Sequence, residues 1–351
     1  MKQKKITSFW LDTDFLRMFI VTLLIFISMS LLSPKFTRSS VILSMGYQIP
    51  ELGFYSLAMM MVMVTGGRDL SVVGIGNLAG IFGAMIMHLG YERCPAGSPA
   101  VGYVLLGVAA ALTTGLVCGI INGLFVSRFN IPAMLLTMAT NYIFTGLSIA
   151  LTDAQAVTKI PDSFAYLGNN VFLRIPIPLW MLLLALAFSA CLLNCTRYGF
   201  EVRMLGSNPK ASHYSGMNNR RILMKTYIYS GVMSAMAGLI ILARTSTAKA
   251  DYASTYTFQA ILCAVLGATA PNGGFAKISC MVLSLASLQF LSSGFSLLRL
   301  GGYFKQFAWG ALLVMVLSLN YFINLYRQRR SVRAIRKKAL RDAETSAKKE
   351  A

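Results

Sequence analysis

The sequence predicts an all-α protein, a polytopic bundle of about ten transmembrane helices. Its 351 residues are 56% hydrophobic and only 13% charged, whereas about 25% of the residues in a soluble protein are charged. Apolar runs recur along nearly the whole chain. The 32 lysine and arginine residues lie mostly between these runs and at the two ends of the chain.

The first apolar run, residues 15–32, follows a short basic N-terminus. A cleaved signal peptide has a shorter apolar core and a small-residue cleavage site, so we expect a retained helix. The next run, 51–64, is shorter than the roughly 20 residues of a membrane helix. It therefore either takes in 41–49 or ends part way across. Residues 35–50 are otherwise expected to form an external loop with a short re-entrant piece.

Further spans are expected, in alternating directions, at 70–89, 101–126, 131–151, 177–193, 225–242, 256–270, 277–297 and 303–326. Residues 1–326 then form one membrane domain, and 327–351 form a basic cytoplasmic tail. With both termini in the cytoplasm, lysine and arginine are more than twice as frequent inside as outside. Cytoplasmic loops carry such an excess, so membrane orientation explains the net charge of +20 without nucleic acid.

No chemistry-bearing cluster is evident in the sequence. Five of the six cysteines fall within or beside apolar runs, where thiols pack as small hydrophobic groups. The two histidines lie far apart, and no cysteine and histidine spacing is typical of zinc. We therefore expect no catalytic residue, no metal site and no cofactor.

The stretch 65–71, Thr-Gly-Gly-Arg-Asp-Leu-Ser, interrupts what hydropathy alone would join into one long helix. Irregular backbone at membrane depth is tolerated only where protein or a water-filled cavity covers it. Interrupted helices of this kind indicate a solute path in transporters, and an ordinary cytoplasmic hairpin is the alternative. A short span, a polar break and a long span recur at 256–297, with the break at 269–274. This predicts a weak internal repeat, unless two glycine-rich turns coincide by chance.

Small residues recur at helical spacing in two spans. Gly115, Gly119 and Gly123 lie four residues apart, as do Gly76 and Gly80. Small residues let helix backbones approach closely in lipid. The spacing therefore predicts tight helix packing, and it does not reveal a function.

Polar side chains inside apolar spans are candidates for a solute path. They are expensive in a membrane unless they face a cavity or one another. Hydrogen bonding between helices is the alternative role for each. For one of them, Asp69, pairing with Arg68 and capping of the helix that begins near Leu70 are further roles, and we favour the capping. The candidates are Asp69, Asn77, Thr137, Thr140, Asn141 and Gln259.

Three motifs, in the right order, resemble the ribose/xylose-type ABC sugar-importer permeases. Residues 65–71 resemble the Gly-Gly-Ile-Asp-Leu-Ser signature of that family. Residues 206–218 match its cytoplasmic Gly-x-Asn-x-x-Ala-x-x-x-Ser-Gly-x-Asn loop, and 260–267 followed by 273–274 form the third match. Arg68 stands where the family usually has an aliphatic residue, and the residues around 273–274 also depart. These departures concern the substrate and not the fold.

The resemblance implies a permease subunit of a binding-protein-dependent ABC importer in a bacterial inner membrane, which carries a monosaccharide or a similar small polar solute. It implies a second permease subunit, identical or related, a separate ATPase subunit and a periplasmic or extracellular solute-binding protein. The permease itself is then embedded in membrane lipid. The sequence has no Gly-Lys dipeptide and hence no phosphate-binding loop. The permease is therefore not expected to be an enzyme, and ATP hydrolysis is expected on another chain.

Two alternatives remain open. An ion-coupled secondary transporter would typically place acids or histidines at mid-membrane, where this sequence has few. An ABC permease for nucleosides fits the same motifs.

The loop 196–224 is the candidate docking site for the ATPase. We expect its glycine, asparagine and proline to turn the chain, and residues 210–214 to form a short surface helix that a following glycine stops. A solvated basic loop held by anionic lipid is the alternative. The residues expected to couple the two subunits are Gly206, Asn208, Pro209, Ala211, Ser215 and Gly216. On the other side, 152–174 and 243–256 are expected to receive the binding protein.

Overall fold

The computed structural model describes residues 13–93 and 101–318, which are helical apart from turns and one short hairpin. The first helices are α1 (Thr13–Leu32), α2 (Ser39–Val64), α3 (Val72–Arg93), α4 (Val101–Phe129) and α5 (Ala133–Thr152). They are followed by α6 (Asp162–Asn169), β1 (Val171–Phe172), β2 (Ile175–Pro176), α7 (Ile177–Cys195), α8 (Arg197–Ser207), α9 (Pro209–Tyr214), α10 (Asn219–Thr245), α11 (Tyr256–Leu266) and α12 (Ile278–Leu297). A last helix covers 302–318, where the described range ends.

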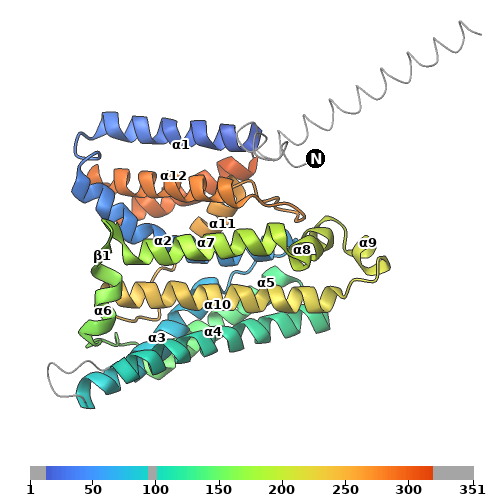
Figure 1. Cartoon of the computed structure of the whole chain (residues 1–351), viewed down its shortest axis with the longest axis horizontal. Coiled ribbons are helices and arrows are strands. Elements are labelled where there is room, and N and C mark those ends of the chain that lie inside the picture. The colour runs from blue at the N-terminus through green and yellow to red at the C-terminus, as the bar shows by residue number, and fades with distance from the viewer. Residues whose placement is uncertain (1–12, 94–100, 319–351) are drawn as a thin grey trace, which may run out of the picture.

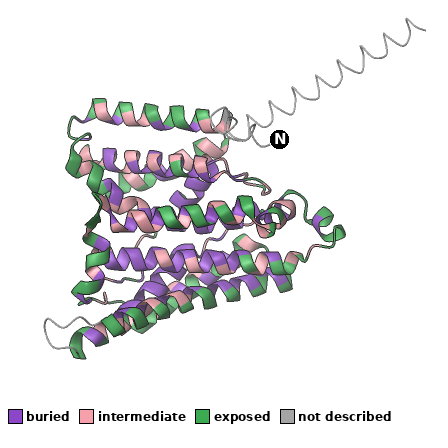
Figure 2. Cartoon of the chain, in the orientation of Figure 1, coloured by how far each residue is buried: buried purple, intermediate pink, exposed green. Residues whose placement is uncertain are grey.

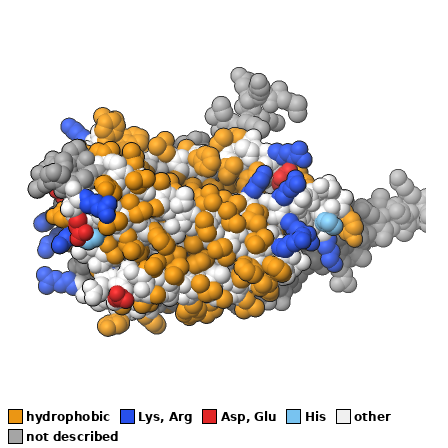
Figure 3. Space-filling view, turned by 90° about the horizontal axis from the view of Figure 1, so that it is seen from below, with side chains coloured by type: hydrophobic (Ala, Val, Ile, Leu, Met, Phe, Trp, Pro, Cys, Tyr) orange, Lys and Arg blue, Asp and Glu red, His pale blue; other side chains and the backbone are white. Residues whose placement is uncertain are grey.

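The long helices lie side by side along one axis (Figure 1). The antiparallel hairpin of β1 and β2 lies with α6 at one end of the bundle, here called the α6 end, and α8 and α9 lie at the other, the α9 end. Apolar side chains cover the middle of the surface, whereas lysine and arginine gather at both ends (Figure 3). An apolar belt between two charged ends is the surface of a protein that spans a membrane.

Seven of the described helices are long and apolar enough to cross a membrane: α1, α3, α4, α5, α7, α10 and α12. The predicted fold class, a polytopic helical membrane bundle, is therefore confirmed. The predicted number of about ten spans stays a prediction, because it also needs α2, the shorter α11 and the last helix. Cys94, the basic N-terminus and the predicted tail 327–351 lie outside the described residues.

The prediction of a loop over 35–50 is wrong, because α2 begins at Ser39 and continues through Pro50 to Val64. The alternative, that the short run takes in 41–49, is confirmed. Every residue from Pro50 to Thr65 is buried, and α2 packs against α10, α11, α7 and α12. A helix that is apolar on all sides belongs in the core. There the neighbouring helices compensate for the N–H group that proline lacks.

Helix α10 is the central helix of the bundle and packs against α4, α2 and α3. It is largely buried, whereas α1, which packs mainly on α12, is largely not (Figure 2). Glycines make the contacts of α10 close. A Cβ atom on Gly231 would lie 2.1 Å from the carbonyl oxygen of Gly115, and one on Gly238 would lie 2.0 Å from that of Gly76. The tight packing predicted from the glycine spacing is thus confirmed.

We predict that Gly231→Ala destabilises the protein by about 1–3 kcal/mol, the usual cost of overpacking, because the new methyl group meets a backbone carbonyl that cannot move aside. The thermal midpoint of the purified protein in detergent measures the change. Gly146→Ala is the matched control, since nothing lies within 4 Å of a Cβ at that position of α5. Equal midpoints for the two variants would contradict the packing argument.

Candidate functional site

The two breaks that the sequence predicted, 65–71 and 269–274, lie against each other at the α9 end. The N–H of Gly274 donates a hydrogen bond of 2.8 Å to the carbonyl oxygen of Val64, the last residue of α2. A Cβ on Gly273 would lie 2.7 Å from the backbone nitrogen of Gly66. All three glycines, Gly66, Gly273 and Gly274, have φ between 85° and 90°, a conformation that favours glycine.

The loop motif, residues 206–218, reaches the same point through α8. A Cβ on Gly206 would lie 1.9 Å from the carbonyl oxygen of Val64 and 2.4 Å from the nitrogen of Gly274. Gly206 therefore touches the end of one interrupted helix and the break of the other. We call Gly66, Gly206, Gly273 and Gly274 the glycine junction. The three motifs, far apart in sequence, thus meet at one place.

The predicted loop 196–224 ends earlier than expected, because α10 begins at Asn219. The remaining loop, 196–218, is built by capping residues of its motif. The Asn208 side chain accepts hydrogen bonds from the N–H groups of Lys210 and Ala211, both at 3.1 Å, and so begins α9. Asn218 accepts from the N–H of Arg221 at 3.1 Å and begins α10. Side-chain acceptors of this kind satisfy N–H groups that a helix start leaves without partners.

The short helix predicted at 210–214 is confirmed as α9, which begins at Pro209. Ser215 follows it, and its N–H and hydroxyl groups both donate to the Ala211 carbonyl. Gly216 comes next with φ of 77°, as expected of the glycine that stops the helix. The turn expected at Gly206 is wrong, because Gly206 lies inside α8, where it allows close backbone contact.

Helix α8 is also fixed to α10. The hydroxyl groups of Tyr198 and Thr226 lie 2.8 Å apart. Burial raises the pKa of Tyr198 to about 12, so this phenol keeps its proton further into the alkaline range than a free tyrosine does. The loop is therefore an ordered part of the bundle and not a free chain between two helices.

Asp69 is fully buried just before α3. Its Oδ1 atom accepts hydrogen bonds from the N–H of Ser71 at 3.0 Å and the Ser71 hydroxyl at 2.5 Å, and its Oδ2 accepts from the Ser230 hydroxyl of α10 at 2.7 Å. Asn122 of α4 donates to the Ser71 hydroxyl at 2.7 Å. Among the described residues, Asp69 holds the start of α3 against α4 and α10 and does not pair with Arg68. Sequence reasoning named Ser71 only as the last residue of the 65–71 motif, and it missed Asn122 and Ser230, whose only signal was polarity within apolar runs.

Two other path candidates, both on α5, support the same segment. The Thr137 hydroxyl accepts a hydrogen bond from the N–H of Leu70 at 3.0 Å, and Asn141 accepts from the N–H of Gly74 at 3.1 Å. The Thr140 hydroxyl donates to the Thr137 carbonyl at 3.2 Å. The contacts of Thr137 and Asn141 are the interhelical alternative, realised around the first break, whereas the bond of Thr140 stays within α5.

The remaining two candidates lie toward the α6 end. Asn77 donates to the backbone carbonyls of Ala250 and Tyr252, at 2.9 and 2.8 Å, and so ties α3 to the loop after α10. Gln259 of α11 lines a cavity of about 280 Å³ between α2, α11, α12 and the last helix. The structure thus separates the six candidates. Four lie around the first break, Asn77 binds the loop after α10, and Gln259 lines the cavity.

A buried ion pair at the α6 end was not predicted. Glu51 of α2 is fully buried and pairs with Arg244 near the end of α10. The Tyr256 hydroxyl, at the start of α11, donates to the same carboxylate at 3.1 Å. The group joins α2, α10 and α11. No pattern in the sequence paired residues this far apart.

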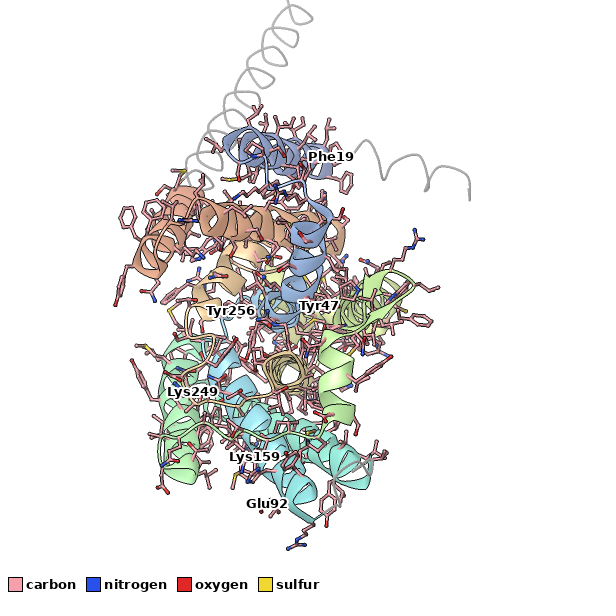
Figure 4. The ribbon with its side chains drawn as sticks, turned by 90° about the vertical axis from the view of Figure 1, so that its left-hand side faces the viewer. Phe19, Tyr47, Glu92, Lys159, Lys249 and Tyr256 are labelled. Carbon is pink, nitrogen blue, oxygen red and sulfur yellow. The ribbon has the colours of Figure 1, made fainter. Side chains whose placement is uncertain are left out.

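The two loops expected to receive a binding protein are joined to each other. Val157 and Ala248 form an isolated antiparallel bridge with two backbone hydrogen bonds of 3.0 Å. Viewed from the α6 end (Figure 4), Lys159 and Lys249 lie on the same side of the bundle. Because of this bridge, the loops 152–174 and 243–256 form one continuous surface.

A polytopic helical bundle with two interrupted helices joined at a shared junction is typical of a membrane transport component. The chain belongs to the family described as "Branched-chain amino acid transport system / permease component", which it matches over residues 41–319. It is therefore a multi-pass membrane permease, and the predictions of a permease and of a non-enzymatic subunit are confirmed.

Curated relatives cover nearly the same length. The ribose import permease protein RbsC of Haemophilus influenzae is 28% identical over 310 residues, which are 87% of this chain and 93% of that protein. The L-arabinose transport system permease protein AraH of Escherichia coli is 28% identical, over 85% of this chain and 87% of that protein. The resemblance drawn from the three motifs is thus confirmed. No solved structure matches the chain.

We predict that Asp69→Ala lowers the free energy of unfolding by about 1–3 kcal/mol, because it leaves buried hydroxyl and N–H groups without an acceptor. The thermal midpoint in detergent tests this. The control is Asp251→Ala, whose carboxylate side chain is 76% exposed. If Asp69→Ala and Asp251→Ala had the same thermal midpoint, the buried hydrogen bonds of Asp69 would not be holding α3 in place.

Proposed function

We propose that this chain is the permease subunit of a binding-protein-dependent ABC importer that carries a monosaccharide across a bacterial inner membrane. One observation supports this above the others: α8 of the loop 196–218 contacts both interrupted helices at the glycine junction. A partner that moves this loop moves both breaks together. Such rigid-body transmission is how a docked subunit drives a change of access.

The partner at the α9 end is an ATPase subunit in this proposal. The surface of the loop suits docking, because Tyr214 on α9 is 88% exposed and Lys210, Arg220 and Arg221 beside it are exposed as well. An exposed aromatic ring with neighbouring cations fits a cleft that has apolar and acidic groups. The α9 end and both chain termini then face the cytoplasm, and a second permease subunit, identical or related, completes the pathway.

The α6 end then faces the binding protein. The bridged loops around Val157 and Ala248 form the receiving surface, with Lys159 and Lys249 as its cations. Complementary charges guide the encounter of two proteins and set their register. Of the path candidates, we assign solute contact to Gln259, whereas contact of the other five with solute stays a prediction.

The sugar assignment rests on the relatives. Their names give ribose and L-arabinose as the transported solutes, and the motifs of this chain resemble the sugar permeases. An ion-coupled secondary transporter and a nucleoside permease are the competing functions. Uptake that requires the ATPase subunit and survives an ionophore excludes the ion-coupled transporter. Competition between pentose and nucleoside for uptake decides whether the chain is a nucleoside permease.

We predict that Tyr214→Asp reduces co-purification of the ATPase subunit about tenfold, since an anchor at the centre of an interface contributes 1.4 kcal/mol or more. The readout is the ATPase recovered on a tagged permease when both are co-expressed from neighbouring genes. Tyr166→Asp is the matched control, because Tyr166 is exposed at the opposite end, on α6. Full recovery with Tyr214→Asp would remove α9 from the docking surface.

We predict that Lys159→Glu together with Lys249→Glu lowers binding-protein-dependent uptake about tenfold, because reversed charges repel a complementary surface. ATPase recovery should stay at the wild-type level. The salt dependence of uptake provides a second readout, since screening weakens exposed charge pairs. Unchanged uptake in the double variant would place the receiving surface elsewhere.

A further inference from the structure

The cavity at Gln259 lies between the two interrupted units of the bundle. Its walls come from α2, the start of α11, the second half of α12 and the start of the last helix. Its volume is about 280 Å³, just below the roughly 300–1,000 Å³ of pockets for drug-sized ligands. It therefore suits a small solute. The polar and aromatic residues that carry the argument are Gln48, Gln259, Gln289, Lys305, Gln306 and Trp309.

Amide groups of the cavity keep free hydrogen-bonding capacity. Gln289 is 5% exposed, and its Nε2 donates to the Oε1 of Gln48 at 3.0 Å and to the hydroxyl of Ser293 at 3.1 Å. The Nε2 of Gln259 makes one long contact, 3.5 Å, with the Thr255 hydroxyl. Within the described part of the chain, the Oε1 atoms of Gln259 and Gln289 accept no hydrogen bond. Both residues line the cavity, and amide oxygens that accept no bond from the protein can accept one from a ligand with hydroxyl donors.

Aromatic rings form the apolar part of the same wall. Trp309 is 5% exposed, and Tyr256 borders the cavity with its hydroxyl already donated to Glu51. The C–H face of a sugar ring packs on such surfaces through dispersion. Amides for hydroxyl groups and rings for C–H groups are together the chemistry that a monosaccharide requires.

The charges of the cavity argue against an amino acid, although the family description names one. A zwitterion brings an ammonium group, and burying it without a negative partner is costly. No aspartate or glutamate is among the residues that line the cavity, and Lys305 is their one charged side chain. Glu51, which lies behind Tyr256, is already paired with Arg244.

We propose that this cavity is the solute-binding site within the permease subunit, and that it selects a neutral, polyhydroxylated solute of monosaccharide size over a zwitterionic amino acid. Gln259 and Gln289 accept hydrogen bonds from its hydroxyl groups, and Trp309 packs against its ring. The inference rests on the proposed function and deepens it. It locates the site toward the α6 end, between α2 and α12, and away from the Asp69 contacts at the first break.

Trp309 supplies the readout. The chain has three tryptophans, so the full-length variant Trp10→Phe, Trp180→Phe fluoresces from Trp309 alone. We expect ribose or L-arabinose to change its emission saturably, in nanodiscs and without other subunits, and leucine to leave it unchanged. Gln289→Leu and Gln259→Leu should each raise the Kd about tenfold, as expected when a polar contact is lost.

Two controls separate binding from folding. Gln155→Leu replaces an exposed glutamine in the loop after α5 that does not line the cavity. It should leave the pentose Kd of the permease unchanged, because no binding protein is present in that measurement. Gln259→Leu removes only one long contact within the protein, so it is expected to fold even where Gln289→Leu does not. Uptake by the complete assembly should fall with the two cavity variants at low pentose concentration and recover at high concentration.

The inference is overturned if leucine and not pentose changes the emission, or if an assembly that imports pentose does so equally well with Gln259→Leu and Gln289→Leu. Failure of the proposed function looks different. In that case the wild-type assembly imports no monosaccharide with its ATPase and binding protein present, whatever Trp309 reports.

Discussion

The close approach of three backbones at the glycine junction is the contact on which the arrangement of the bundle depends. A helix leaves its last carbonyl groups without partners, and inside a membrane protein water is not freely available to bind them. At the end of α2 the N–H of Gly274 satisfies the Val64 carbonyl. This is possible because Gly206 has no Cβ, which would otherwise lie 1.9 Å from that oxygen. The absence of a side chain at Gly206 thus allows the backbones of the loop, α2 and the second break to come into contact.

Different chemistry holds α2 in place at the two ends of the bundle. At the α9 end, α2 meets the second interrupted unit through backbone contacts of glycines. At the α6 end it meets α10 and α11 through the buried Glu51 carboxylate, Arg244 and the Tyr256 hydroxyl. Breaking a buried pair by removing one partner is costly, because the other charge stays buried. The cavity lies between α2 and α12 near this second connection, so any movement of α2 against the second unit changes its shape.

The motif at 206–218 has a structural reason at nearly every position. Asn208 and Asn218 begin two helices, Ser215 and Gly216 end one, and Gly206 is close to two backbones. The motif residues of this loop therefore set its backbone geometry. Docking of a partner is a consequence that needs the exposed residues around it, such as Tyr214, and these lie on the outer side of the same short helix.

The sequence by itself determined the membrane class, most helix positions, the two breaks and the short helix α9, because apolar periodicity, glycine pairs and capping residues act over a few neighbouring positions. It failed at α2, where a helix continues through Pro50 because surrounding helices bury it on all sides. Only the tertiary structure decided that the three motifs meet, that Asp69 binds Ser230 and that Glu51 pairs with Arg244. The Asp69 and Glu51 contacts join residues more than 150 positions apart. Pairing over long separations is set by how helices pack, which no local pattern records.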